Sequence, residues 1–238
     1  MKHLVRIASV SPRVHLGNVT KNCKELETVY RTYAEQVDVI VTPELSLTGY
    51  TCGDLFVNRH LIDRAEEGLL QLAEMTAEYG KKGAALVVGV PYEVDGELFN
   101  CGAFLWNGMV LALVPKIYLP NYGEFYEKRW FASAQDLHDT PLCYAGEDVL
   151  LTARRQLFHT YGDARFGIEI CEDVWAPNPP STELALSGAD IIFNLSASDE
   201  LIGKHDYLIN LLKQQSARNI SGYVYSGCGY GESTQDVV

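Results

Sequence analysis

Cys171 stands in the segment FGIEICEDVW (166–175), between an alternating, strand-like run and two carboxylates. A cysteine presented at the end of a strand is a candidate nucleophile for attack on a carbonyl carbon. The carboxylates that follow it, Glu172 and Asp173, would disfavour the thiolate and raise the pKa of the thiol. A nucleophilic role for Cys171 therefore requires a base to take its proton and a cation or N–H pair to stabilise an oxyanion.

Two residues of suitable type also follow strand-like runs. Glu44, in TPELSLTGY (42–50), comes after an apolar run, where desolvation would raise the pKa of its carboxyl towards neutrality and make it a base. Lys116, in VPKIYLP (114–120), would favour the thiolate and stabilise the oxyanion, joined by the backbone N–H of Glu172. None of the six histidines has a strand-end context, so a Cys–His pair is disfavoured.

Each of these residues also has an ordinary structural interpretation. A strand-end cysteine is most often a small buried hydrophobe. Glu44 could be a capping or solvated carboxylate, and Lys116 could be a surface charge whose stem covers apolar neighbours. The separations along the chain do not decide between these interpretations, because they say nothing about contact in space.

The elements that must position these residues alternate between strands and helices. Apolar periodicity, β-branched runs and turn residues predict strands and helices with these bounds: strands 4–9, 37–44, 84–91, 189–198 and 222–227, and helices 18–36, 57–80 (with Gly80 as its C-cap), 181–188 and 204–220. Two further pairs of strands are predicted as hairpins, within 99–116 around Asn107-Gly108 and within 148–173 around Gly162-Asp163. This order predicts mixed sheets covered by helices, with the strand ends at Glu44, Cys171 and 196–198 converging on a ligand site.

Three segments carry a family resemblance. PELSLTGY, PKIYLPNYGEFYEKRWF and GIEICEDVW, in this order, resemble the three signatures of the nitrilase, or carbon–nitrogen hydrolase, superfamily. The resemblance implies an α/β fold, a four-layer α-β-β-α sandwich, with Glu44 as general base, Lys116 as oxyanion stabiliser and Cys171 as nucleophile. It also implies that Glu127, in EFYEKRWF, keeps the lysine charged and oriented.

Within that superfamily, LPNYGEFYEKRWF and NLSAS are most similar to the glutaminase domains of glutamine-dependent NAD synthetases. This resemblance implies glutamine as substrate and five substrate contacts: Tyr50, Tyr122, Glu172, Trp175 and Ser198. Aromatic side chains suit a substrate that has a methylene chain between polar ends. The same residues could equally pack in the core or at its rim.

Such synthetases also carry an ATP-using domain with an SGGxDS-type phosphate loop, and no segment of the 238 residues matches that loop. We therefore expect residues 1–238 to be a glutamine amidohydrolase domain that stops short of its last strands. Its ammonia would pass in cis to a synthetase domain, where ATP, Mg²⁺ and deamido-NAD would bind; the amidohydrolase domain itself should need no cofactor. The alternatives are a stand-alone amidase for ω-amides or N-carbamoyl compounds, and a catalytically silent interaction module.

The composition of the sequence limits the classes of partner that the protein is expected to bind. The 238 residues carry a net charge of −12 and a sequence pI near 4.9, which disfavours binding to nucleic acid or anionic membranes. The six cysteines form no CxxC pair and no apolar run suggests a leader or a span, so we expect reduced thiols, no zinc and a cytoplasmic protein. Family members commonly assemble, so at least a homodimer is expected.

Overall fold

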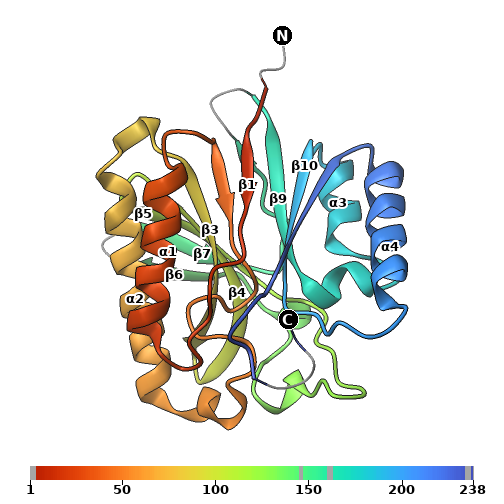
Figure 1. Ribbon diagram of the computed structural model, residues 1–238, viewed down its shortest axis with the longest axis horizontal. Coiled ribbons are helices and arrows are strands. Elements are labelled where there is room, and N and C mark those ends of the chain that lie inside the picture. Colours follow the sequence, from red (N-terminus) through yellow and green to blue (C-terminus); the bar gives the residue numbers. More distant parts are fainter. Residues whose placement is uncertain (1–3, 145–146, 160–162, 234–236, 238) are drawn as a thin grey trace.

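The computed structural model describes residues 4–144, 147–159, 163–233 and 237. Two sheets lie face to face at its centre (Figure 1). The larger has seven strands, in the spatial order β1 (Ile7–Ser9), β2 (Val39–Val41), β3 (Ala85–Val94), β4 (Glu97–Trp106), β5 (Met109–Pro115), β7 (Glu147–Leu151) and β6 (Thr140–Tyr144). The smaller has four: β11 (Gly222–Gly227), β10 (Ile191–Ser196), β9 (Arg165–Ile170) and β8 (Phe158–His159).

Helices cover the outer faces of both sheets. In Figure 1, α1 (Val19–Tyr33) and α2 (Arg59–Ala77) lie on the seven-stranded sheet, and α3 (Pro180–Leu186) and α4 (Lys204–Asn219) lie on the four-stranded sheet. The helix α1 begins where its N-cap was expected, since the Asn18 side chain accepts a hydrogen bond from Lys21 N at 3.1 Å. The layers are therefore α, β, β and α, which confirms the predicted sandwich.

An apolar core joins the two sheets. Phe104 of β4 packs against Phe166 of β9 with ring centroids 5.3 Å apart, and Phe166 packs against Phe193 of β10 at 4.8 Å. Burial of one such side chain stabilises a fold by about 1.5–3 kcal/mol. These contacts hold the sheets face to face and so fix the strand ends of one sheet relative to those of the other.

The hairpin turns are formed by residues that adopt positive φ values. Asn107 and Gly108 have φ values of 50° and 88° and join β4 to β5, as predicted. Asp95 and Gly96, with φ values of 52° and 82°, join β3 to β4 in the same way, at a turn that was not predicted from the sequence. Gly162 lies outside the described residues, but β8 and β9 pair antiparallel on either side of it.

Two predicted elements need correction. Helix α2 ends at Ala77, and Gly80 begins a separate 3₁₀ turn instead of capping the helix. The segment 148–173 is not one pair of strands, because residues 148–151 belong to β7 of the larger sheet, where β7 pairs with β6. Long-range pairing of this kind leaves no local signal in the sequence.

Strand direction sets the position of the site. β1, β2 and β3 pair in parallel, as do β9, β10 and β11. Glu44 follows β2 and Cys171 directly follows β9, while Lys116 directly follows β5. Among the described residues, no helix has the length and apolar character that a membrane crossing would need, and no cluster of His, Cys, Asp and Glu suits a metal ion.

Candidate active site

A buried lysine joins two buried glutamates. Lys116 Nζ donates to Glu44 Oε1 and to Glu127 Oε1, each at 2.7 Å. All three side chains are almost fully removed from solvent. Burial alone would lower the pKa of Lys116, but the carboxylates of Glu127 and Glu44 outweigh it and hold this pKa well above its usual value. The lysine is therefore a fixed positive charge.

The two carboxylate oxygens of Glu44 differ in their hydrogen bonding. Its Oε1 accepts from Lys116 and, at 2.7 Å, from Asn100 Nδ2. Its Oε2 is buried and has no hydrogen-bond partner among the described residues. Burial raises the pKa of Glu44 to about 7, against the charge of Lys116 and with the help of Glu127. A carboxylate with this pKa and a vacant acceptor oxygen is suited to take a proton near neutral pH.

Glu127 is fixed from a second side. Tyr50, one of the predicted substrate contacts, is buried and donates its hydroxyl to Glu127 Oε1 at 2.7 Å. The short helix that starts at Glu127 is tied down through Arg129 and Trp130, which both donate to Asp54. The hydrogen bond thus allows Tyr50 to orient Glu127, which in turn contacts Lys116.

Cys171 occupies a strained turn. It follows β9 with a left-handed φ of 41°, a conformation that costs a residue with a Cβ about 1–3 kcal/mol and that occurs preferentially at functional sites. Its Sγ lies 3.9 Å from the carbonyl oxygen of Ala197, which can accept from the thiol. Burial raises the pKa of Cys171, the charge of Glu44 raises it further, and Lys116 lowers it. Glu44 and Lys116 are therefore both within electrostatic reach of the sulfur and have opposite effects on its pKa.

The two carboxylates that follow Cys171 are engaged elsewhere. Asp173 accepts from three backbone N–H groups, those of Ile117 (3.2 Å), Tyr118 (2.9 Å) and Ile170 (2.9 Å). It thereby ties the chain just after Lys116 to the chain just before Cys171. Glu172 accepts from the Tyr122 hydroxyl at 2.9 Å. These bonds explain how the thiol tolerates an acidic sequence neighbourhood.

A cavity of about 290 Å³ opens at the thiol. Its lining includes Cys171 and four of the five predicted substrate contacts: Tyr122, Glu172, Trp175 and Ser198. Tyr50 is not among the lining residues. The structure therefore gathers four of the five residues around the thiol and leaves Tyr50 out of this lining, and their contact with a substrate stays a prediction.

Lys204 also lines this cavity and was not predicted from the sequence. This first residue of α4 donates to Ser198 Oγ at 2.9 Å, is paired with Asp199, and lies over the ring of Trp175 at 5.5 Å. Trp175 in turn stacks on Tyr207, with ring centroids 5.5 Å apart. The position of Lys204 six residues after Ser198, at the start of a predicted helix, was the one available signal. The cavity thus combines a thiol, aromatic walls, a cation and carboxylates.

Comparison with known proteins identifies the family. The model of the carbon-nitrogen hydrolase family matches residues 6–226. The chain belongs to the carbon-nitrogen hydrolase family. The buried contact between Glu44 and Lys116 and the strand-end Cys171 lie in the three segments whose resemblance to this family was noted from the sequence, and their catalytic roles stay predictions.

Relatives of this carbon-nitrogen hydrolase include proteins that are longer than the chain itself. The glutamine-dependent NAD(+) synthetase of Mycobacterium leprae is 34% identical over 98% of the chain, and that of Mycobacterium tuberculosis is 35% identical over 98%. The chain spans about a third of their length (34% of each).

Solved structures agree on the fold. A glutamine-dependent NAD(+) synthetase from Cytophaga hutchinsonii superposes with a TM-score of 0.80 at 27% identity, covering 93% of this chain and 35% of that one. An amidase from Nesterenkonia superposes with a TM-score of 0.72 over 96% of this chain and 81% of that one. At 20% identity, the amidase supports the fold alone.

Proposed function

We propose that this carbon-nitrogen hydrolase hydrolyses the side-chain amide of glutamine and releases ammonia. The observation that carries the proposal is the buried contact between Lys116 and Glu44 beside the Cys171 thiol, at a cavity of amino-acid size. The relatives that span almost the whole chain are glutamine-dependent NAD synthetases, which favours glutamine over other amides.

The charges of the cavity suit an amino-acid amide. Lys204, which also pairs with Asp199 and donates to Ser198, lines the cavity as a cation that a substrate α-carboxylate can contact. Glu172, held by Tyr122, is a carboxylate available to the α-ammonium group. Trp175 offers an aromatic surface for the methylene groups between these charges and the amide. In this assignment the side-chain carboxamide extends towards Cys171.

The first half-reaction forms a thioester. Glu44 Oε2 accepts the thiol proton as Cys171 Sγ attacks the carboxamide carbon, and Lys116 with the N–H of Glu172 stabilises the oxyanion. The C–N bond then breaks, and Glu44 returns the proton to the departing nitrogen. The products are ammonia and a γ-glutamyl thioester on Cys171.

The second half-reaction releases glutamate. Glu44, again ionised, takes a proton from water as the water oxygen adds to the thioester carbon. Lys116 stabilises the second oxyanion, the C–S bond breaks, and the proton passes to Cys171 Sγ. The free thiol is restored, so the cycle consumes one water per glutamine. Glu127 and Tyr50 act through Lys116, because they hold its charge in place.

The fate of the ammonia is part of the same proposal. In a longer protein of the kind that the relatives represent, ammonia passes in cis to a synthetase domain that uses ATP and Mg²⁺ to amidate deamido-NAD. Residues 1–238 act as the amidohydrolase domain and need no cofactor for their own step. We further propose a cytoplasmic protein that is at least a dimer.

The test is an assay of the purified chain with glutamine, in which ammonia and glutamate should appear in equal amounts. Cys171→Ala should abolish both products while the melting temperature stays within a few degrees. Cys143→Ala, at an exposed cysteine outside the cavity, should leave them unchanged. Hydrolysis of an ω-amide or an N-carbamoyl compound, with none of glutamine, would reject the proposal in favour of a stand-alone amidase.

The proposed transfer of ammonia to a synthetase domain is tested by a separate experiment. The full-length gene product, supplied with glutamine, ATP, Mg²⁺ and deamido-NAD, should form NAD. Glutamine hydrolysis without NAD formation would reject the assignment of the acceptor and leave the glutaminase assignment standing. If the chain hydrolyses none of these amides, it is a silent interaction module.

A further inference from the structure

A second and larger cavity, of about 430 Å³, lies away from the thiol. It is lined at the starts of β2, β3 and β9, by Val39, Ala85 and Phe166 among others. Glu44 and Cys171 come after the opposite, carboxyl ends of β2 and β9. The cavity therefore opens at the far end of the sandwich from the candidate active site, and the proposed glutaminase reaction does not use it.

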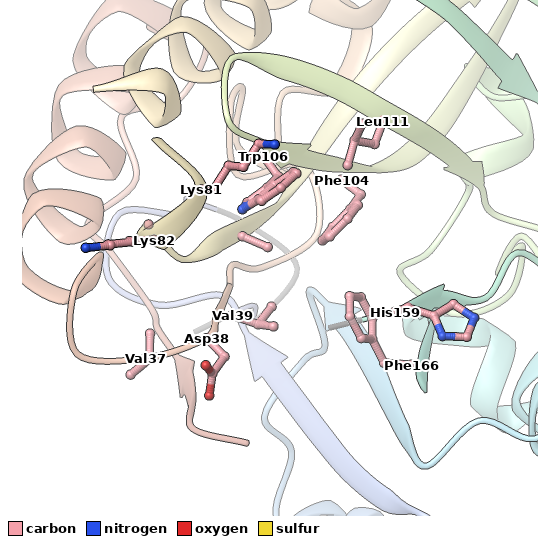
Figure 2. Close-up of a pocket in the computed structure, with 12 residues that line it drawn as sticks. Val37, Asp38, Val39, Lys81, Lys82, Phe104, Trp106, Leu111, His159 and Phe166 are labelled. Carbon is pink, nitrogen blue, oxygen red and sulfur yellow. The ribbon is translucent and has the colours of Figure 1, made fainter. Parts of the chain in front are cut away.

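The inner part of this cavity is apolar and aromatic. Phe104 and Phe166 meet there edge to face, with ring centroids 5.3 Å apart, and both are buried. Trp106 of β4 and Leu111 of β5 continue the apolar lining, and Figure 2 shows Trp106 beside Phe104. The volume lies in the range of small-molecule sites, which is roughly 300–1,000 Å³, and the lining has the aromatic character of such sites.

The rim carries positive charge. Lys81 and Lys82, from the 3₁₀ turn Gly80–Lys82, both line the cavity and are both exposed. In Figure 2 the Lys81 side chain extends towards Trp106, whereas the Lys82 side chain points away from the other lining residues. Within the part of the chain that the structure describes, neither lysine has an ion-pair partner. The acidic rim residue Asp38 is engaged, since its Oδ2 accepts from Arg6 N at 2.7 Å. In a chain of net charge −12, two adjacent cations without carboxylate partners form a local site of attraction for anions.

From this combination we propose that the cavity binds an aromatic anion, a small molecule with a planar apolar group and a carboxylate, sulfonate or phosphate. The planar group packs against the wall that Phe104, Phe166 and Trp106 form, and its burial supplies most of the affinity. The anionic group stays at the opening, where Lys81 contacts it and Lys82 adds a nearby positive charge. A neutral molecule of the same shape lacks the second contact and binds more weakly.

The probe for the test is 8-anilinonaphthalene-1-sulfonate, compared with N-phenyl-1-naphthylamine, which is the same molecule without its sulfonate. The sulfonate probe should bind the folded protein with one saturable site, detected by its fluorescence. Lys81→Ala/Lys82→Ala should weaken its binding about tenfold, as expected for the loss of one exposed charge contact and one nearby positive charge, and leave the neutral probe unchanged. Lys213→Ala, at an exposed lysine of α4, should change neither.

A blocking variant separates this site from general apolar binding. Leu111→Trp at the partly exposed rim should exclude both probes, because the added ring occupies the opening. Glutamine hydrolysis should continue in every variant, which also shows that each has folded. Equal binding of the sulfonate probe to the wild type, the lysine variant and Leu111→Trp would overturn the proposal, as would the absence of saturable binding to the wild type.

Discussion

Lys116 Nζ lies 2.7 Å from Glu44 Oε1 inside the protein, although 72 residues separate the two along the chain. The contact joins the strand β5 to the end of β2, and it places a fixed positive charge on the base that the mechanism requires. A buried charge pair of this kind is an inefficient means of stabilising a fold, because both ions lose their hydration. The presence of such a pair beside a thiol fits the chemical role proposed for it.

The first prediction concerns that lysine. Lys116→Met should reduce kcat for glutamine by about 10²–10³-fold, the usual cost of a lost oxyanion donor. It should also destabilise the protein by about 3–5 kcal/mol, because Glu44 and Glu127 are left buried without their cation. Chemical denaturation and steady-state kinetics measure the two effects.

A double variant separates stability from catalysis at this position. Lys116→Met/Glu127→Gln removes one of the two stranded carboxylates, so part of the lost stability should return while kcat stays low. If activity returned together with stability, Lys116 would be a structural residue and the proposed oxyanion contact would be wrong.

The second prediction is a pH profile. Glu44 accepts a proton only when it is ionised, and burial raises its pKa to about 7. The rate kcat/KM should therefore fall as pH decreases through about 7, since the protonated carboxyl cannot act as the base. Burial also raises the pKa of Asp173 to about 7, so the profile of Asp173→Asn is the control and should keep the same acidic limb. An acidic limb at the pH typical of an exposed glutamate would contradict the role of Glu44.

The third prediction concerns Asp173 as a positioning residue. Its two oxygens accept from three backbone N–H groups, and Asn at this position offers one acceptor oxygen and an NH₂ group that cannot accept. Asp173→Asn should cost about 1–3 kcal/mol in stability. Because the bonds link the segments that carry Lys116 and Cys171, kcat should fall more than KM rises. Glu172→Gln, at the cavity wall, should show the reverse pattern, and the same pattern in both variants would remove the positioning role.

The fourth prediction tests the substrate assignment of Lys204. Lys204→Met should raise KM for glutamine about tenfold or more, because a charge contact to the α-carboxylate is lost. The same variant should hardly change the turnover of 4-aminobutanamide, which has no α-carboxylate. An equal loss for both amides would mean that Lys204 acts on the shape of the cavity through Ser198 and Asp199.

The sequence predicted most of what depends on local patterns. The helix after Asn18 and the turn at Asn107-Gly108 follow from capping and turn chemistry, and the structure confirms both. The pairing of β6 with β7, and the single parallel contact of β7 with β5 at Leu113 and Leu151, depend on distant segments and could not be predicted from local patterns.

The candidate site likewise combines features that local sequence patterns predicted with features that depend on distant segments. Glu44, Lys116 and Cys171 could be named as candidates from their strand-end positions, but only the family resemblance joined them. The sequence contains no signal that Tyr50 turns inward to Glu127, because this partner stands 77 residues away, at the start of a short 3₁₀ helix. Lys204 was missed for a related reason, since its role arises where α4 meets the end of β10.

The most direct test of the account is covalent labelling by a glutamine analogue with a diazoketone in place of the carboxamide. Cys171 is one of six thiols, and the account requires that it alone be activated and adjacent to a glutamine site. Intact-mass measurement followed by peptide mapping should find one adduct per chain, on Cys171, blocked by excess glutamine and absent in Cys171→Ala. Labelling spread over the other five cysteines, or an unlabelled Cys171 in the folded protein, would contradict the account.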